Sequence, residues 1–343
     1  MSFAHTSEAA REEQPQAATV PALAVSGLSI RFRSRFGEVA AASDVSFSLA
    51  RGELLALLGE SGSGKSVTAR ATMGLLTGPN VAVRAERIAL AGQDVGALDE
   101  EGWRAVRGRR IAMVFQDAMS ALNPVLSIGD QLGETFRIHE GSTARAAREK
   151  SIELLRLVRI PAPERRIDDY PHQFSGGMRQ RILIAMAIAL RPDVLIADEP
   201  TTALDVTVQA QILELLDDLR RSLGMAVLLI THDLGVVAKV ADRAVVMYGG
   251  RIVETAPVVD LFARPAHPYT EGLLASIPGV SESEDLVAIP GSPPNLARLP
   301  PGCAFEPRCH RRVARCAMER PLLKPRGLER SAACCVTEPE ARA

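Results

Sequence analysis

The amino-acid sequence predicts an α/β fold built around a largely parallel sheet. Short apolar runs of strand length alternate along the chain with longer segments whose apolar residues have helical spacing. This alternation is typical of parallel strands joined by right-handed helical crossovers. The sequence has no internal repeat, so we expect one such domain and not two.

The individual elements follow from the same patterns in chain order. The expected strands are 24–30, 39–49, 53–58, 111–115, 194–197 and 226–231. The expected helices are 66–76, 134–158, 179–190 and 208–223. Proline and glycine accumulate after a boundary near 260–268. We therefore expect a domain at 23–260 and a smaller C-terminal extension at 261–343.

Length and charge limit the classes of protein to which the chain can belong. Its 343 residues, 47% of them hydrophobic, suffice for one large domain and a smaller one. Forty basic and 41 acidic residues leave a net charge of −1, which gives no support for broad binding to nucleic acid. The apolar run 182–190 is much shorter than the roughly 18 residues that span a bilayer. Residues 1–22 lack the features of an export signal, so we expect a disordered tail and a cytoplasmic protein.

A phosphate-binding loop is expected between strand 53–58 and helix 66–76. The pattern GxxxxGKS is formed by Gly59, Glu60, Ser61, Gly62, Ser63, Gly64, Lys65 and Ser66. Its glycines let backbone N–H groups face phosphate oxygens, and the helix N-terminus adds partial positive charge. Lys65 would reach the β- and γ-phosphates, and the Ser66 hydroxyl would bind Mg²⁺. A glycine-rich turn with a chance lysine is disfavoured because a strand and a helix flank the loop on the correct sides.

Two carboxylates, Asp198 and Glu199, end the strand 194–197. A carboxylate at the end of a hydrophobic strand is typical of the Mg²⁺ site of phosphate-loop ATPases. Asp198 would hold Mg²⁺, and Glu199 would polarise the attacking water. Two solvated carboxylates at a strand end are the alternative, which the nearby phosphate loop makes less favourable.

A second glycine motif, Ser175, Gly176 and Gly177, begins the helix expected at 179–190. With Phe174 and Met178 it resembles the signature motif of ATP-binding-cassette (ABC) ATPases, whose common form is Leu-Ser-Gly-Gly-Gln. The resemblance implies an ABC-type domain with a mostly parallel sheet core, an antiparallel β subdomain and a helical subdomain. It also implies that two domains enclose two ATP molecules head to tail, because in this family the motif contacts the nucleotide of a partner domain.

Further positions match the same family. Gln116 matches the glutamine that senses Mg²⁺ and the attacking water, and His232 matches the histidine that contacts the γ-phosphate. Asp205 belongs to a segment, 203–205, that matches the loop crossing to the partner. Phe36 lies where the family places an aromatic residue that stacks on adenine, although a phenylalanine near a strand is as often part of the core.

Within the ABC family, the chain most resembles the ATPase subunits of dipeptide/oligopeptide and nickel importers. This narrower resemblance is carried by 60–63, 174–181, 267–270 and 302–309. It implies two transmembrane permease subunits, a second ATPase that is a paralogue or the same chain, and an extracytoplasmic solute-binding protein. Segment 118–128 would receive a helix of the permease on the cytoplasmic side of the inner membrane.

All five cysteines lie in the C-terminal extension. A reducing compartment argues against disulfides and favours a metal or cluster site. Four thiolates could hold zinc or a [4Fe–4S] cluster, or the thiols could simply pack in a small lobe. The resemblance to the importers implies a cluster whose ligands are Cys303, Cys309, Cys316 and Cys334.

The sequence therefore predicts the ATP-hydrolysing subunit of an ABC importer that takes up di- or oligopeptides or a related small solute such as nickel, with ATP and Mg²⁺ at its site. The alternative is an ABC ATPase that acts without a transporter, in DNA repair or translation. Such proteins usually carry paired cassettes, long coiled coils or basic surfaces, and the sequence has none of these.

Overall fold

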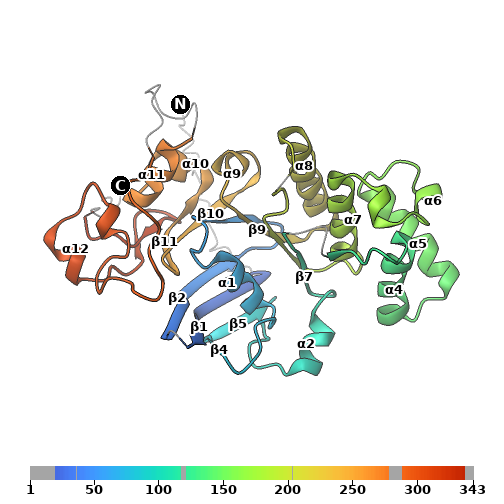
Figure 1. The fold of residues 1–343 in the computed structure, drawn as a ribbon, viewed down its shortest axis with the longest axis horizontal. Coiled ribbons are helices and arrows are strands. Elements are labelled where there is room, and N and C mark those ends of the chain that lie inside the picture. Colours follow the sequence, from blue (N-terminus) through green and yellow to red (C-terminus); the bar gives the residue numbers. More distant parts are fainter. Residues whose placement is uncertain (1–19, 36, 117–120, 203, 278–287, 337–343) are drawn as a thin grey trace, which may run out of the picture.

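A computed structural model of the protein describes residues 20–35, 37–116, 121–202, 204–277 and 288–336. Two sheets lie at its centre, a group of helices at one end and the C-terminal extension at the other (Figure 1). The α/β class expected from the sequence is confirmed. Most of the tail expected at 1–22, up to residue 19, lies outside the described residues.

The main sheet has the strand order β12-β13-β11-β10-β3-β9-β8-β7. Its strands are β3 (Leu54–Leu58), β7 (Ile111–Val114), β8 (Val194–Asp198), β9 (Ala226–Thr231), β10 (Arg243–Tyr248), β11 (Arg251–Pro257), β12 (Lys324–Pro325) and β13 (Ser331–Ala332). The segment from β10 to β7 is parallel, and the other strands pair antiparallel. Every residue of β3, β8 and β9 is buried, as expected of parallel strands covered on both faces.

The smaller sheet is antiparallel and packs against the main sheet. Its strands are β1 (Leu23–Ser34), β2 (Gly37–Leu49), β4 (Val81–Arg84), β5 (Arg87–Leu90) and β6 (Gln93–Asp94). Helix α1 (Lys65–Thr72) lies between the two sheets (Figure 1), and one hydrophobic cluster joins Leu28 of β1, Ala69 of α1 and Ile230 of β9. This shared core fixes the start of α1, and with it the phosphate loop, relative to both sheets.

A group of helices forms one end of the molecule (Figure 1). It consists of α4 (Ile128–Glu140), α5 (Ala144–Leu157), α6 (Pro163–Arg166), a 3₁₀ turn at Pro171–Gln173, α7 (Gly176–Ile188) and α8 (Val206–Leu223). The single helix expected at 134–158 is wrong. Gly141, at φ +65°, ends α4, and the Thr143 hydroxyl accepts the N–H of Ala146 at the start of α5. Helix α1 also ends earlier than expected, at Thr72.

The C-terminal part of the chain adds short elements around the edge of the main sheet. They are α9 (Leu234–Val240), α10 (Val258–Ala263), α11 (Pro268–Ala275), a 3₁₀ turn at Glu306–Arg308 and α12 (Ala314–Met318), while α2 (Glu100–Val106) precedes β7. Strand β13 pairs with β11, and Phe305 packs against Tyr248 and Tyr269. The extension therefore shares a sheet and a core with the preceding domain, and the limits 23–260 and 261–343 stay a prediction.

Candidate nucleotide-binding site

The phosphate loop joins β3 to α1, and its backbone conformation requires glycine. Gly59, Gly62 and Gly64 have φ angles of +147°, +78° and +102°, in the region that disfavours other residues. A Cβ atom on Gly59 would overlap the carbonyl oxygen of Met247, and one on Gly64 would overlap that of Ala41. The loop is therefore pressed closely against neighbouring backbone and cannot widen on those sides.

Lys65 closes the loop from inside. Its ammonium Nζ donates to the carbonyl oxygens of Gly59 at 2.8 Å and Glu60 at 3.0 Å. The side chain is buried, and burial lowers the pKa of Lys65, against the opposing effect of Glu199 and Asp198. A positive charge thus lies at the base of the loop with two carboxylates nearby.

Ser66 and Asp198 supply a pair of oxygen ligands beside this lysine. The Ser66 hydroxyl donates to Asp198 Oδ1 at 2.8 Å. Asp198 is only 1% exposed, and burial raises the pKa of its carboxyl. In the described part of the chain no group of three or more His, Cys, Asp or Glu side chains is arranged for a metal. One or two protein oxygens completed by phosphate oxygens are nonetheless the usual setting for Mg²⁺, so the pair fits that ion.

Glu199 is the centre of a hydrogen-bonded group at the carboxyl ends of the parallel strands of the main sheet. Its Oε2 accepts from Gln116 Nε2 at 3.1 Å and from Thr202 Oγ1 at 3.0 Å, and its Oε1 lies 3.2 Å from His232 Nδ1. The parallel strands β7, β8 and β9 bring Gln116, Glu199 and His232 together because their carboxyl ends share one edge. Thr202 was missed by the sequence reasoning; its hydroxyl three residues after Glu199 was the available signal.

The Ser-Gly-Gly motif lies at the start of α7. The Ser175 hydroxyl accepts the N–H of Met178, and both Ser175 and Gly176 are exposed. A Cβ atom on Gly177 would lie 2.5 Å from Val208 Cγ1, so α7 packs closely on α8. Asp205 is likewise exposed and caps α8.

Within the described residues, no hydrogen bond joins this motif to the phosphate loop of the same chain. The motif therefore leaves its helix N-terminus open to another molecule. Phe36 and Ala203 lie outside the described residues.

The cysteines gather in the extension but do not form a ligand group. Cys303, Cys309, Cys316 and Cys334 interact electrostatically, and the Cys303 N–H donates to the Cys316 carbonyl at 2.8 Å. Burial raises the pKa of the Cys303 thiol to about 11 and also raises that of Cys309, so both are protonated at neutral pH. Among the described residues none of these thiols belongs to a metal-binding cluster. The geometry does not fit the predicted [4Fe–4S] site.

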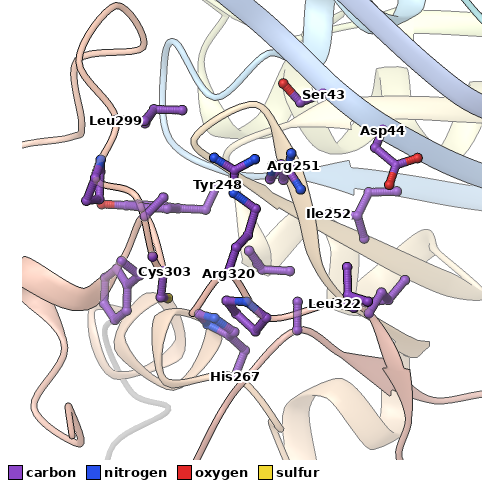
Figure 2. A pocket seen from close by; sticks show the side chains of 18 of the residues that line it. Ser43, Asp44, Tyr248, Arg251, Ile252, His267, Leu299, Cys303, Arg320 and Leu322 are labelled. Atoms are coloured by element: carbon purple, nitrogen blue, oxygen red, sulfur yellow. The ribbon is translucent and has the colours of Figure 1, made fainter. Parts of the chain in front are cut away.

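A separate cavity of about 270 Å³ lies between β2, β11 and the extension (Figure 2). Its walls include Asp44, Arg251, His267, Cys303 and Arg320. None of the expected nucleotide-site residues lines it, so it is distinct from the phosphate loop.

The phosphate loop, the paired carboxylates at the end of β8 and the capped Ser-Gly-Gly helix together define the class of ABC ATPases. A family model described as ABC transporter matches residues 42–202, and one described as oligopeptide/dipeptide transporter, C-terminal region, matches residues 253–316.

Two relatives show to which family of proteins this chain belongs. A Brucella abortus (strain 2308) protein named as a peptide import ATP-binding protein is 53% identical over 310 residues, which cover 90% of this chain and 93% of that protein. The dipeptide transport ATP-binding protein DppD of Bacillus subtilis (strain 168) is 51% identical over 295 residues, which cover 86% of this chain and 88% of that protein. The chain belongs to the ATP-binding proteins of the oligopeptide/dipeptide import family of ABC transporters.

Solved structures confirm the predicted ABC-type fold. The ATP-binding cassette MJ0796 was solved as a dimer in a post-hydrolysis state with ADP and Pi. It is 25% identical to this chain with a TM-score of 0.61, and the match covers 69% of this chain and 98% of the MJ0796 chain. The protein cbiO1 from Clostridium perfringens, part of the ABC transporter complex cbiONQ, is 26% identical with a TM-score of 0.61. The match covers 71% of this chain and 91% of the cbiO1 chain.

Proposed function

We propose that this chain couples ATP hydrolysis to the uptake of di- or oligopeptides, or of a related small solute such as nickel, across the cytoplasmic membrane. The observation that carries the proposal is the position of Glu199. Its carboxylate lies at the same sheet edge as Asp198 and accepts hydrogen bonds from Gln116 and Thr202. A carboxylate held in this way beside a phosphate loop is suited to orient and activate a water molecule.

We propose the following roles in hydrolysis. The N–H groups of loop 59–64 and the Lys65 ammonium stabilise the charge on the phosphates. Ser66, Asp198 and Gln116 would hold Mg²⁺, which when bound neutralises charge on the β- and γ-phosphates. The group around Glu199 acts on the water.

In this scheme Glu199 accepts the proton of the attacking water, and His232, next to Glu199, contacts the γ-phosphate. Phe36 would stack on adenine.

A second ATPase domain is needed to complete each site. Ser175, Gly176 and Asp205 are exposed, and with Gly177 they are proposed to serve the nucleotide bound by the partner. The exposed N-terminus of a helix, with its N–H groups and partial positive charge, is a suitable anion site. The dimer of the similar cassette MJ0796 supports this arrangement. We propose that the partner is a second copy of this chain or a paralogue.

The remaining partners would be two transmembrane permease subunits and an extracytoplasmic solute-binding protein, with no nucleic acid. In the described parts of the chain no helix has both the length and the apolar character to cross a membrane. We propose a peripheral position on the cytoplasmic face of the inner membrane, as the resemblance to importer ATPases implies. Val125 and Leu126, 75% and 38% exposed, lie in the described part of segment 118–128 and offer an apolar contact for a permease helix.

Transport by the assembled complex tests the proposal. Proteoliposomes containing the chain, its permeases and its binding protein are expected to accumulate labelled dipeptide only with ATP, and Glu199→Gln should abolish accumulation. The matched control is Glu214→Gln. Glu214 lies on α8 and forms an exposed ion pair with Arg159. Recovery of the chain with ribosomes or DNA and without membrane subunits would instead support the non-transport alternative.

Two predictions from the sequence stand outside this mechanism. We propose residues 23–260 as the ABC ATP-binding domain and residues 261–343 as its C-terminal extension. A [4Fe–4S] cluster on Cys303, Cys309, Cys316 and Cys334 rests on the resemblance to peptide importers alone, because these cysteines form no such ligand group in the described residues. Iron and sulfide analysis of protein purified without oxygen tests it, and colourless protein with stoichiometric zinc would contradict it.

A further inference from the structure

Three segments that are distant in the sequence meet at Glu60 in the phosphate loop. The Glu60 backbone N–H donates to the Tyr269 hydroxyl oxygen at 2.8 Å, across 209 residues. Arg308 Nη1 donates to Glu60 Oε2 at 2.8 Å and Nη2 donates to Oε1 at 3.0 Å, across 248 residues. These residues come from 60–63, 267–270 and 302–309, the same segments that carry the resemblance to peptide importers.

The Arg308–Glu60 pair is not a solvent-exposed surface contact. The Arg308 side chain is 7% exposed and that of Glu60 is 23% exposed. The guanidinium lies over the rings of Tyr248 and Phe305, and its Nε donates to the Pro290 carbonyl at 2.9 Å. The hydrogen bonds to Glu60 raise the pKa of Arg308, so the side chain stays charged. A planar, two-pronged contact in this setting defines the orientation of the carboxylate closely.

The contact reaches the nucleotide site through a single residue. The Glu60 carbonyl oxygen accepts both the Lys65 ammonium at 3.0 Å and the N–H of Ser63 at 3.2 Å. Glu60 is thus held from outside the loop at its N–H and its carboxylate, while its carbonyl holds the lysine inside. Movement of Glu60 would move both Lys65 and the first turn of the loop.

We propose that Arg308 of the extension is a positioning residue of the nucleotide site. Through Glu60 it keeps the phosphate loop in the shape that receives the nucleotide, and the Tyr269 hydroxyl provides a second support. The inference rests on the proposed function only in that the loop binds ATP. It makes the C-terminal extension a structural part of the ATP site.

The test measures MgATP affinity of the full-length chain by titration calorimetry, together with melting temperature. Arg308→Gln and Glu60→Gln remove the same ion pair from its two sides, and each is expected to weaken ATP binding about 5- to 20-fold. The double variant should bind no more weakly than either single variant, because one interaction is lost in all three. Arg308→Lys, which keeps the charge but not the paired geometry, should recover part of the affinity.

The matched control is Arg311→Gln. Arg311 lies three residues after Arg308 in the extension, and it pairs at 2.7 Å with Glu271, which is not part of the phosphate loop. It is expected to leave ATP affinity within about twofold. In the assembled transporter, Arg308→Gln should raise KM for ATP while kcat changes much less, a pattern that lost stability of the extension alone would not produce.

Additive effects in the double variant, or a lowered melting temperature with unchanged ATP affinity, would overturn the inference and leave Arg308 as a residue that only holds the extension. Glu60→Gln keeps the size of the side chain, so the test survives if Arg308→Gln does not fold. A wild-type chain that binds no ATP would overturn the proposed function itself, and the inference with it.

Discussion

Nδ1 of His232 lies 3.2 Å from Oε1 of Glu199, although the two residues are 33 positions apart. Strands β8 and β9 pair in parallel with Asp198 opposite Ile230, so both residues emerge at the same edge of the sheet. Glu199 has a φ of +47°, an uncommon conformation for a residue other than glycine. Such strained positions are found disproportionately at functional sites, and here the turn directs the carboxylate toward its three partners.

The first prediction concerns Glu199 as the base. Glu199→Gln keeps the size of the side chain but removes its ability to accept a proton, so ATP hydrolysis by the assembled transporter should fall about 10²- to 10⁴-fold. ATP binding should persist, and gel filtration with ATP should show more dimer. The control Glu214→Gln should retain its rate. Near-normal turnover of Glu199→Gln would refute the role given to this residue.

Thr202 is predicted to orient that carboxylate. Thr202→Val keeps the shape of the side chain and removes the hydroxyl that donates to Glu199 at 3.0 Å. We expect kcat to fall about fivefold, corresponding to about 1 kcal/mol for one hydrogen bond at an exposed site, with ATP affinity unchanged. Thr201→Val, one position earlier, is the control. Equal rates for the two variants would show that the hydroxyl of Thr202 has no part in hydrolysis.

Gly177 is predicted to be required for the packing of α7 on α8. Gly177→Ala places a methyl group 2.5 Å from Val208 Cγ1, and this overlap should lower the free energy of unfolding by about 1–3 kcal/mol. Urea unfolding measures the change. Gly176→Ala is the control, because its Cβ would meet Leu204 at an ordinary 3.5 Å.

Adding Val208→Ala to Gly177→Ala should restore part of the lost stability, because it removes the overlapping methyl group. Additive losses in that double variant would place the cause elsewhere than in the α7–α8 contact.

Features that a few adjacent residues determine could be predicted from the sequence, whereas contacts between distant segments could not. The phosphate loop and the carboxylates at the end of β8 could be predicted because a few adjacent residues determine them. The break between α4 and α5 was also encoded locally, by Gly141 and Thr143, but the helical spacing on both sides concealed it.

Contacts between distant segments could not be predicted in the same way. The bond between Arg308 and Glu60 spans 248 residues, and no pattern in either segment identifies its partner. The spacing of the cysteines likewise does not determine the geometry of their sulphurs, and the cluster implied by the resemblance finds no matching ligand group in the described residues.

The last prediction concerns the pH dependence of stability at His267. This residue is 1% exposed and caps α11, with its Nδ1 accepting the N–H of Tyr269 at 3.0 Å. Burial lowers the pKa of His267 to about 4, whereas the unfolded chain has the ordinary value of 6.5. As the pH falls below 6.5, the unfolded state binds a proton that the folded state does not. Stability should therefore decrease between pH 6.5 and 4, by up to about 3 kcal/mol.

Urea unfolding at several pH values, compared between wild type and His267→Asn, measures this effect. Asparagine keeps an acceptor for the cap but does not titrate. The variant should therefore lose the contribution of His267 to the pH dependence of the free energy of unfolding. Glu254 accepts the N–H of His267, and burial raises its pKa, which adds stability as the pH falls and opposes the histidine. Because Glu254 is present in both proteins, its contribution cancels in the difference. Identical slopes would mean that His267 carries a proton in the folded state over this range.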